Sequence, residues 1–210
     1  MLDIILDIKM KKLILMVMIL PLIFGCTQKI NYDEVDEIEC CEPHATIYLQ
    51  PYGNFSKEEV IKLLPILEQH FGLNYGFWHF EIKNPINLPL EGKVGKKYKA
   101  SSILNLERKL LKGDEIIIGL THEDICADIH NTKNYGIVGL SFLKRQVCVV
   151  SDKRLHDKTN LWKPILHEFM HTFYGSRHCP NDDPKCIMKD AKGHGNFAIQ
   201  KYLCKDCVRN

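Results

Sequence analysis

The chain has 210 residues, of which 45% are hydrophobic and 26% are charged. This composition is typical of a globular protein with a single domain. Its 28 basic and 26 acidic residues give a formal net charge of +2. A chain this close to neutral gives no electrostatic reason to expect a nucleic acid or an anionic membrane surface as partner. The function must therefore be inferred from local groups of residues.

Residues 1–25 predict a bacterial lipoprotein signal peptide. Two lysines precede an apolar run at residues 13–24, and Gly25 and Cys26 follow it. These are the parts of a secretory signal, and the run is shorter than the roughly 20 residues that span a bilayer. LIFGC resembles a lipobox, whose cysteine becomes lipidated; the alternative is an ordinary signal peptide in which Cys26 has no role. We expect an exported protein that a lipid on Cys26 anchors to a bacterial membrane, facing the periplasm or the cell surface.

Residues 26–44 are polar and acidic, which predicts a tether, so the folded domain is expected at residues 45–210. Hydrophobic periodicity predicts strand, helix, strand, helix, then three strands and a helix. The expected strands are residues 45–53, 77–82, 115–121, 135–142 and 146–150, and the expected helices are 56–72, 100–111 and one from Thr159. This order predicts an α/β fold in which helices pack against one mixed sheet.

The end of the domain differs from the rest. Residues 45–175 contain all the expected strands and helices, whereas residues 176–210 are rich in Gly, Pro, Asp and Cys. We therefore expect a small, irregular, cysteine-rich C-terminal subdomain that something other than a hydrophobic core stabilises.

The segment HEFMH at residues 167–171 carries the strongest functional signal. In a helix, His167 and His171 share a face and can bind one metal ion through their ring nitrogens. Zinc would lower the pKa of a bound water towards neutrality, and Glu168 would accept the proton of that water as it attacks a carbonyl group. The alternative is an amphipathic helix with two solvent-facing histidines.

A catalytic zinc typically takes three protein ligands, so a third must come from elsewhere. His178 follows His171 by seven residues, and in a continuous helix it would lie about 10 Å further along the same face. Gly175 can end the helix in a left-handed conformation and turn the chain back towards the metal. His178 is therefore the predicted third ligand, with His194 and Asp183 as the alternatives.

These residues resemble the metzincin peptidases, whose pattern is H-E-x-x-H-x-x-G-x-x-H followed by a methionine turn. More narrowly, the chain is similar to the archaemetzincins, in which a cysteine follows the third histidine, a second cysteine precedes a methionine by two residues, and a C-x-x-C closes the pattern. The matching residues here are Cys179, Cys186, Met188, Cys204 and Cys207. The resemblance is specific over residues 166–207.

The chain departs from the family pattern at two places. Tyr174 stands where the family has its glycine, and Gly175 comes one residue later. Six residues, 180–185, separate the first two cysteines, where the family has four. Both departures predict small insertions in a loop, and both bear on the position of His178.

The resemblance implies a zinc metallopeptidase with a metzincin-like zincin fold: a twisted mixed sheet, an active-site helix and the cysteine-rich subdomain. It implies two zinc ions, a catalytic one on His167, His171 and His178 and a structural one on Cys179, Cys186, Cys204 and Cys207, with Met188 beneath the catalytic zinc. Four thiolates that include a C-x-x-C also suit a closed tetrahedral site on chemical grounds. Two disulfides are the alternative, which export would favour.

The resemblance further implies a peptide or protein substrate that binds as an added strand at the sheet edge above the active-site helix. Residues 146–150 are the expected edge strand. We expect a monomer with no nucleic-acid partner. The competing function is a lipid-anchored binding protein that zinc stabilises and in which the HEFMH site is catalytically idle. Sequence alone leaves open the peptide specificity, the choice between end trimming and internal cleavage, and the membrane leaflet.

A second polar cluster, containing His122, Glu123, Asp124, Asp128 and His130, lies in a predicted loop and could hold an ion or line the cleft. Such a cluster is more often a solvated turn. Cys40, Cys41, Cys126 and Cys148 could form disulfides, but no spacing determines a pairing.

Overall fold

The computed structural model describes residues 46–75, 78–129, 131–190 and 197–208. The predicted signal peptide with Cys26, the tether, Cys40, Cys41, His130 and His194 lie outside these residues. Within the described ranges, no helix is both long and apolar enough to cross a membrane.

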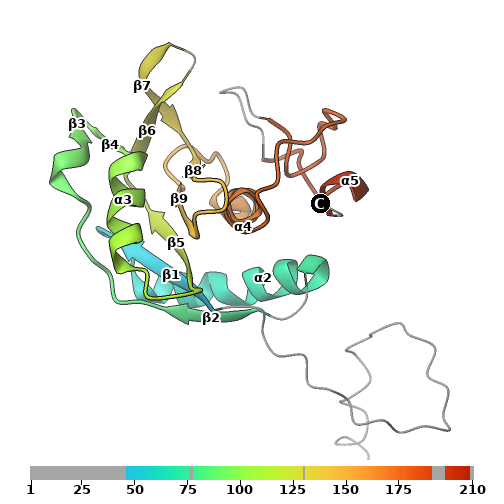
Figure 1. Ribbon diagram of the computed structural model, residues 1–210, viewed down its shortest axis with the longest axis horizontal. Coiled ribbons are helices and arrows are strands. Elements are labelled where there is room, and N and C mark those ends of the chain that lie inside the picture. Colours follow the sequence, from blue (N-terminus) through green and yellow to red (C-terminus); the bar gives the residue numbers. More distant parts are fainter. Residues whose placement is uncertain (1–45, 76–77, 130, 191–196, 209–210) are drawn as a thin grey trace, which may run out of the picture. The chain divides into compact units, whose positions relative to one another are not determined.

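A five-stranded sheet with the strand order β2-β1-β5-β9-β8 forms the centre of the fold (Figure 1). Its strands are β1 (Thr46–Tyr52), β2 (His79–Ile82), β5 (Ile116–Thr121), β8 (Gly139–Ser141) and β9 (Val147–Ser151). The first four in spatial order are parallel to one another, and β8 alone is antiparallel to its neighbour. The expected mixed sheet is therefore confirmed.

A second sheet with the order β3-β4-β6-β7 was not expected. It contains β3 (Lys93–Val94), β4 (Lys97–Lys99), β6 (Asp124–Ile129) and β7 (Thr132–Ile137). The predicted loop after β5 was wrong, because Asp124–Ile129 forms a strand that pairs with β4 on one side and with β7 on the other. The predicted strand at residues 135–142 is divided at Val138, since β7 pairs with β6 and β8 pairs with β9.

The three long helices lie close to their expected positions. They are α2 (Lys57–Tyr75), α3 (Ala100–Leu110) and α4 (Trp162–Phe169), which continues into the π-helical turn η4 (Met170–Tyr174). The other helical elements of the described residues are two single turns, η2 (Leu90–Gly92) and η3 (Lys158–Asn160), and the short α5 (Lys205–Val208). The expected end of α2 at Gly72 was wrong, because an interior glycine costs a helix only about 1 kcal/mol.

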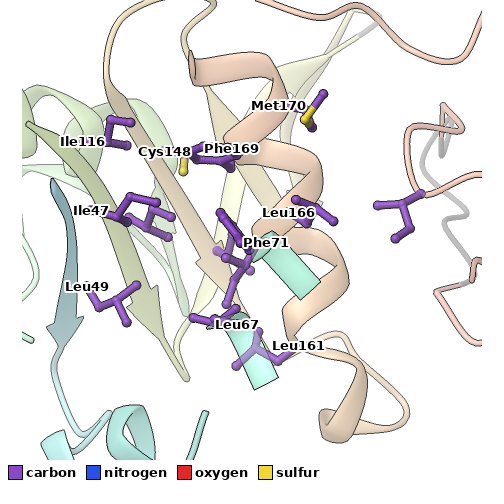
Figure 2. Packing of buried hydrophobic residues seen from close by; sticks show 14 of the residues in the cluster. Ile47, Leu49, Leu67, Phe71, Ile116, Cys148, Leu161, Leu166, Phe169 and Met170 are labelled. Atoms are coloured by element: carbon purple, nitrogen blue, oxygen red, sulfur yellow. The ribbon is translucent and has the colours of Figure 1, made fainter. Parts of the chain in front are cut away.

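Helices cover both faces of the five-stranded sheet. On β5, Ile116, Ile118 and Leu120 pack in one core with α2 and α4, whereas Ile117 packs in a second core with α3. Figure 2 shows Phe169 of α4 pointing towards Cys148 and Ile116 of the sheet, in the same cluster as Phe71 of α2. The position of α4 is therefore determined by the sheet and by α2.

The C-terminal segment has little regular structure, as expected, but it is not independent of the main core. Besides α5, it has an isolated bridge between Cys186 and Tyr202. Ile187, Met188 and Leu203 are buried and belong to the same cluster as the α4 residues. The few apolar residues of this segment therefore attach it beside the active-site helix.

Glu107 of α3 gives a pH test of the packing. It is fully buried, and burial raises the pKa of its carboxyl well above the ordinary value. A Cβ at Gly119 would lie 2.1 Å from its Oε1, so β5 needs glycine at this position. The folded state holds the Glu107 proton more tightly than the unfolded state, so the wild type loses stability as the pH rises above the ordinary carboxyl range.

We therefore predict that Glu107→Gln, which cannot ionise, increases the free energy of unfolding relative to the wild type at pH 7. The gain should diminish as the pH falls through the ordinary carboxyl range, below which the carboxyl is protonated in both states. Urea unfolding of both proteins at several pH values measures it. A difference that does not change with pH would contradict the assignment.

Candidate metal centre and active site

Three predicted site residues, His167, Glu168 and His171, lie on α4 and the turn after it, and the packing of this helix determines their orientation. Leu166, Phe169 and Met170 are fully buried in the core and anchor one side of the helix. His167, Glu168 and His171 are each 8% exposed. The alternative of two solvent-facing histidines is therefore wrong, since both imidazoles lie inside the protein.

His167 and His171 point their Nε2 atoms at each other, 3.0 Å apart. The Nδ1 of His167 donates to the carbonyl of Ile187 at 2.7 Å, and that of His171 donates to the carbonyl of Ser176 at 2.5 Å. Because burial lowers the pKa of both histidines to about 4, each ring carries only its Nδ1 proton at neutral pH. Two nitrogen lone pairs then face each other, which is the arrangement that a shared metal cation stabilises.

His178 completes a group of three nitrogen donors. Its ring centroid lies 5.4 Å from that of His167 and 4.9 Å from that of His171. One ring nitrogen from each histidine lies within 4.8 Å of the others. The His178 side chain is 46% exposed, so this three-histidine group is accessible to solvent on one side. Three donors with an open position fit a catalytic zinc.

The alternative third ligands are not in this group. Asp183 accepts a hydrogen bond from the Tyr202 hydroxyl at 3.0 Å and one from the Lys185 amide at 2.9 Å, within the C-terminal segment. The structure places it in neither candidate metal group among the described residues. His194 lies outside the described residues.

The π-helical turn η4 accommodates the extra residue before the glycine. A π-turn contains one residue more than an α-helical turn. Gly175 follows it in the left-handed conformation, with φ 66° and ψ 23°, and the Ser176 amide donates to the carbonyl of Met170 at 3.1 Å. The predicted role of Gly175 in ending the helix is confirmed. The insertion lies in the helix itself and leaves His178 beside the other two histidines.

Glu168 lies against the strand β8. Burial raises the pKa of its carboxyl, and a hydrogen bond with the Ser141 side chain and the proximity of His171 act in the opposite direction. A Cβ at Gly139 would lie 2.7 Å from both Cγ and Oε1 of Glu168. The carboxyl group is thus enclosed beside the histidines and can exchange a proton with a molecule bound there.

The four predicted cysteines form a second group of ligand atoms. Their Sγ atoms lie 3.7 Å apart for Cys179 and Cys204, 3.7 Å for Cys186 and Cys207, and 3.5 Å for Cys204 and Cys207. Four sulfurs around a tetrahedral zinc, at bonds of about 2.3 Å, are separated by about 3.8 Å. All four are free thiols rather than two disulfides. Burial raises the pKa of Cys186 to about 11, so ionisation there requires a nearby cation.

A short turn, Cys186-Ile187-Met188, connects the two groups. Cys186 belongs to the sulfur cluster, and the Ile187 carbonyl accepts the proton of His167. Met188 is fully buried, and its carbonyl accepts from the Cys179 amide at 2.7 Å. The predicted methionine turn therefore lies beside the His167 end of the site; a role for the Met188 sulfur stays a prediction.

The described residues of the other polar cluster belong to no candidate metal group. His122 lies between Asp152 and Glu59, with its Nδ1 2.9 Å and its Nε2 3.1 Å from their carboxylate oxygens. Asp124 instead pairs with Arg154 through two bonds of 2.7 and 2.8 Å. Asp128 accepts a bond from the Asn134 amide at 2.8 Å. These side chains have separate structural partners, and Cys126 and Cys148 are buried free thiols.

The expected edge strand was wrong. Residues 146–150 correspond to β9, which lies between β5 and β8, so in the described part of the chain β8 is the edge strand on this side of the sheet and β2 is the edge strand on the other. Sequence reasoning missed Gly139 and Ser141, the β8 residues that contact Glu168. No local sequence pattern identifies these two residues, because their contact with Glu168 depends on where the chain leaves β7 and begins to pair with β9.

The fold is similar to those of several solved structures, three of which follow. The archaemetzincin of Methanopyrus kandleri has 22% sequence identity and a TM-score of 0.68, and the match covers 79% of this chain and 92% of that chain. The archaemetzincin of Archaeoglobus fulgidus complexed with malonate has 22% identity and a TM-score of 0.61, with 78% of this chain and 98% of that chain covered. A zinc-dependent peptidase of Methanocorpusculum labreanum has 19% identity and a TM-score of 0.57, with 77% of this chain and 97% of that chain covered. The chain matches no protein-family model and no curated protein. The expected archaemetzincin-like fold is confirmed.

Gly175 provides a test of the three-histidine geometry. A Cβ there would lie 2.5 Å from Cε of Lys144, on a backbone conformation that costs other residues about 1–2 kcal/mol. We predict that Gly175→Ala lowers the stability by at least this backbone cost and weakens zinc binding at the histidines, measured by competition with a chelator. Gly95→Ala is the matched control, because Gly95 has φ 60° and no atom within 4 Å of its Cβ position. Equal zinc affinity in the two variants would contradict the predicted role of Gly175.

Proposed function

We propose that the chain is a zinc-dependent peptidase that hydrolyses peptide bonds at the site formed by His167, Glu168, His171 and His178. The observation that carries this proposal is the convergence of three histidine nitrogens, with an open side, next to a buried carboxyl group. The fold supports it, since structural neighbours include a zinc-dependent peptidase.

The three histidines would hold the catalytic zinc, which supplies a Lewis acid that lowers the pKa of water and polarises a carbonyl group. The Nδ1 hydrogen bonds to Ile187 and Ser176 keep the Nε2 atoms of His167 and His171 in their ligating form. Glu168 accepts a proton from water as the water attacks the peptide carbonyl, and donates it to the leaving amine. Its buried position beside the histidines suits both transfers.

The edge strand β8 is the proposed docking site for an extended peptide. The Ser151 amide donates to the Val138 carbonyl at 2.8 Å. Because bonded and non-bonded pairs alternate in an antiparallel ladder, Leu140 bonds to β9 while Gly139 and Ser141 direct their N–H and C=O groups to the other side. These groups can pair with a substrate strand beside Glu168.

The four cysteines would hold a structural zinc. It would stabilise the C-terminal segment and, through the turn of residues 186–188, the carbonyl that orients His167. We further propose that the protein is exported and anchored through lipid on Cys26, as its LIFGC segment predicts, and that it acts as a monomer.

Replacement of the general base tests the catalytic claim. We predict that Glu168→Gln lowers peptide hydrolysis by about 10²- to 10⁴-fold while the zinc content is unchanged. Product formation from a peptide library, analysed by mass spectrometry, is the readout. Equal processing by wild type and variant would favour the zinc-stabilised binding protein instead.

Native mass spectrometry tests the two zinc sites separately. The wild type is expected to carry two zinc ions, His171→Gln one, and Cys207→Ser one together with a lower melting temperature, since structural zinc contributes folding energy. One ion or none in the wild type would refute the two-site proposal.

Fractionation of bacterial cells tests the lipid anchor. The wild type is expected in the membrane fraction and Cys26→Ser in the soluble fraction, because the anchoring lipid is attached to that thiol. Membrane association that persists in the variant would show that Cys26 is not the anchor.

A further inference from the structure

We propose that β8 positions the general base as well as the substrate: Gly139 provides the space for the Glu168 carboxyl group, and the Ser141 hydroxyl holds it. This inference rests on the proposed peptidase function and assigns two positioning residues to it.

The space at Gly139 is the first observation. A Cβ on this residue would meet three atoms of the Glu168 side chain, Cγ and Oε1 at 2.7 Å and Cδ at 3.0 Å. Real Cβ atoms do not approach other atoms so closely, so any side chain at position 139 displaces the carboxyl group or the strand. Gly139 is not in the left-handed region, since its φ is not positive. Close approach of Glu168, and not backbone conformation, is therefore the reason for glycine here.

The position of Ser141 is the second observation. Its side chain lies close enough to the buried Glu168 carboxyl group to act as its hydrogen-bond partner, alongside His171 and His178. Two residues apart on a strand, Ser141 and Gly139 face the same side of the sheet. One of them leaves room and the other supplies a hydroxyl donor, so together they define one location for the carboxyl group.

Leu140, which lies between Gly139 and Ser141, has its side chain on the other face of the sheet. This face is opposite to the one that contacts Glu168, and Leu140 packs there in the core with α3. The backbone groups of Gly139 and Ser141, meanwhile, are those that face away from β9. The strand that would pair with the substrate thus also contacts Glu168. The three residues of β8 therefore determine the positions of both the scissile carbonyl group and the Glu168 carboxyl group that accepts the proton. A shift of β8 would move both.

Kinetics of Ser141 variants test the inference on the full-length, zinc-loaded protein. Ser141→Ala should lower kcat about tenfold, the typical loss when a supporting hydrogen bond is removed, with KM and zinc content unchanged. Ser141→Thr keeps the hydroxyl and should restore most of the rate. Ser101→Ala, on the exposed first turn of α3, is the matched control. Wild-type kcat in Ser141→Ala, a change in KM alone, or failure of threonine to restore kcat would each overturn the assignment.

Gly139→Ala gives an independent test of the space. It should lower kcat more than Ser141→Ala does, and its melting temperature and zinc content report whether it folds. If it does not fold, the Ser141 series decides. Failure of the underlying function has a different signature: the wild type would then show no hydrolysis, or Glu168→Gln would be as active as the wild type. In an active wild type that requires Glu168, a kcat unaffected by either β8 substitution contradicts only the positioning role.

Discussion

Two neutral imidazoles that face each other through their lone pairs constrain much of this structure. The Nε2 atoms of His167 and His171 are 3.0 Å apart, and both Nδ1 protons are already donated to backbone carbonyls. Burial opposes protonation, which would otherwise relieve the repulsion. A cation between the rings resolves the conflict, so the folded geometry and metal binding support each other. The carbonyls that accept these protons belong to Ile187 and Ser176, and the tautomers therefore depend on where the C-terminal segment lies.

The C-terminal segment that orients the histidines also connects the two groups of metal-ligand residues. The turn at residues 186–188 contributes a thiol to the cysteine cluster, a carbonyl to His167 and a buried methionine to the core. Loss of the sulfur site would therefore release the segment that orients the histidine site. Gly175 acts at the other end of this segment, where its left-handed conformation turns the chain so that His178 returns to the helix. A cysteine-rich segment with few regular elements can thus determine the geometry of a site carried mainly by a helix.

The sequence predicted those parts in which local patterns coincide with tertiary structure. HEFMH, Gly175, His178 and the four cysteines are local signals with a definite geometry, and the structure gathers the three histidines in one group and the four cysteines in another. The Ser-x-x-Glu pattern that begins at Ser56 is typical of a helix capping box, and the box is formed, with reciprocal bonds between Ser56 and Glu59. The predictions that were wrong concerned the pairing of strands that are distant in the sequence. The split between β7 and β8 at Val138 and the burial of β9 inside the sheet have no local signature, and they determine which strand is the edge. The π-turn could not be predicted either, because the sequence shows an extra residue but not where the chain accommodates it.

Zinc binding at the three histidines is tested most directly by anomalous diffraction at the zinc absorption edge from crystals of the zinc-loaded protein. We expect one peak among the Nε2 atoms of His167 and His171 and a ring nitrogen of His178, with an open coordination position towards solvent. We expect a second peak among the sulfurs of Cys179, Cys186, Cys204 and Cys207. A map without a peak between the three histidines would contradict the proposed catalytic zinc site, whatever the cysteine cluster binds.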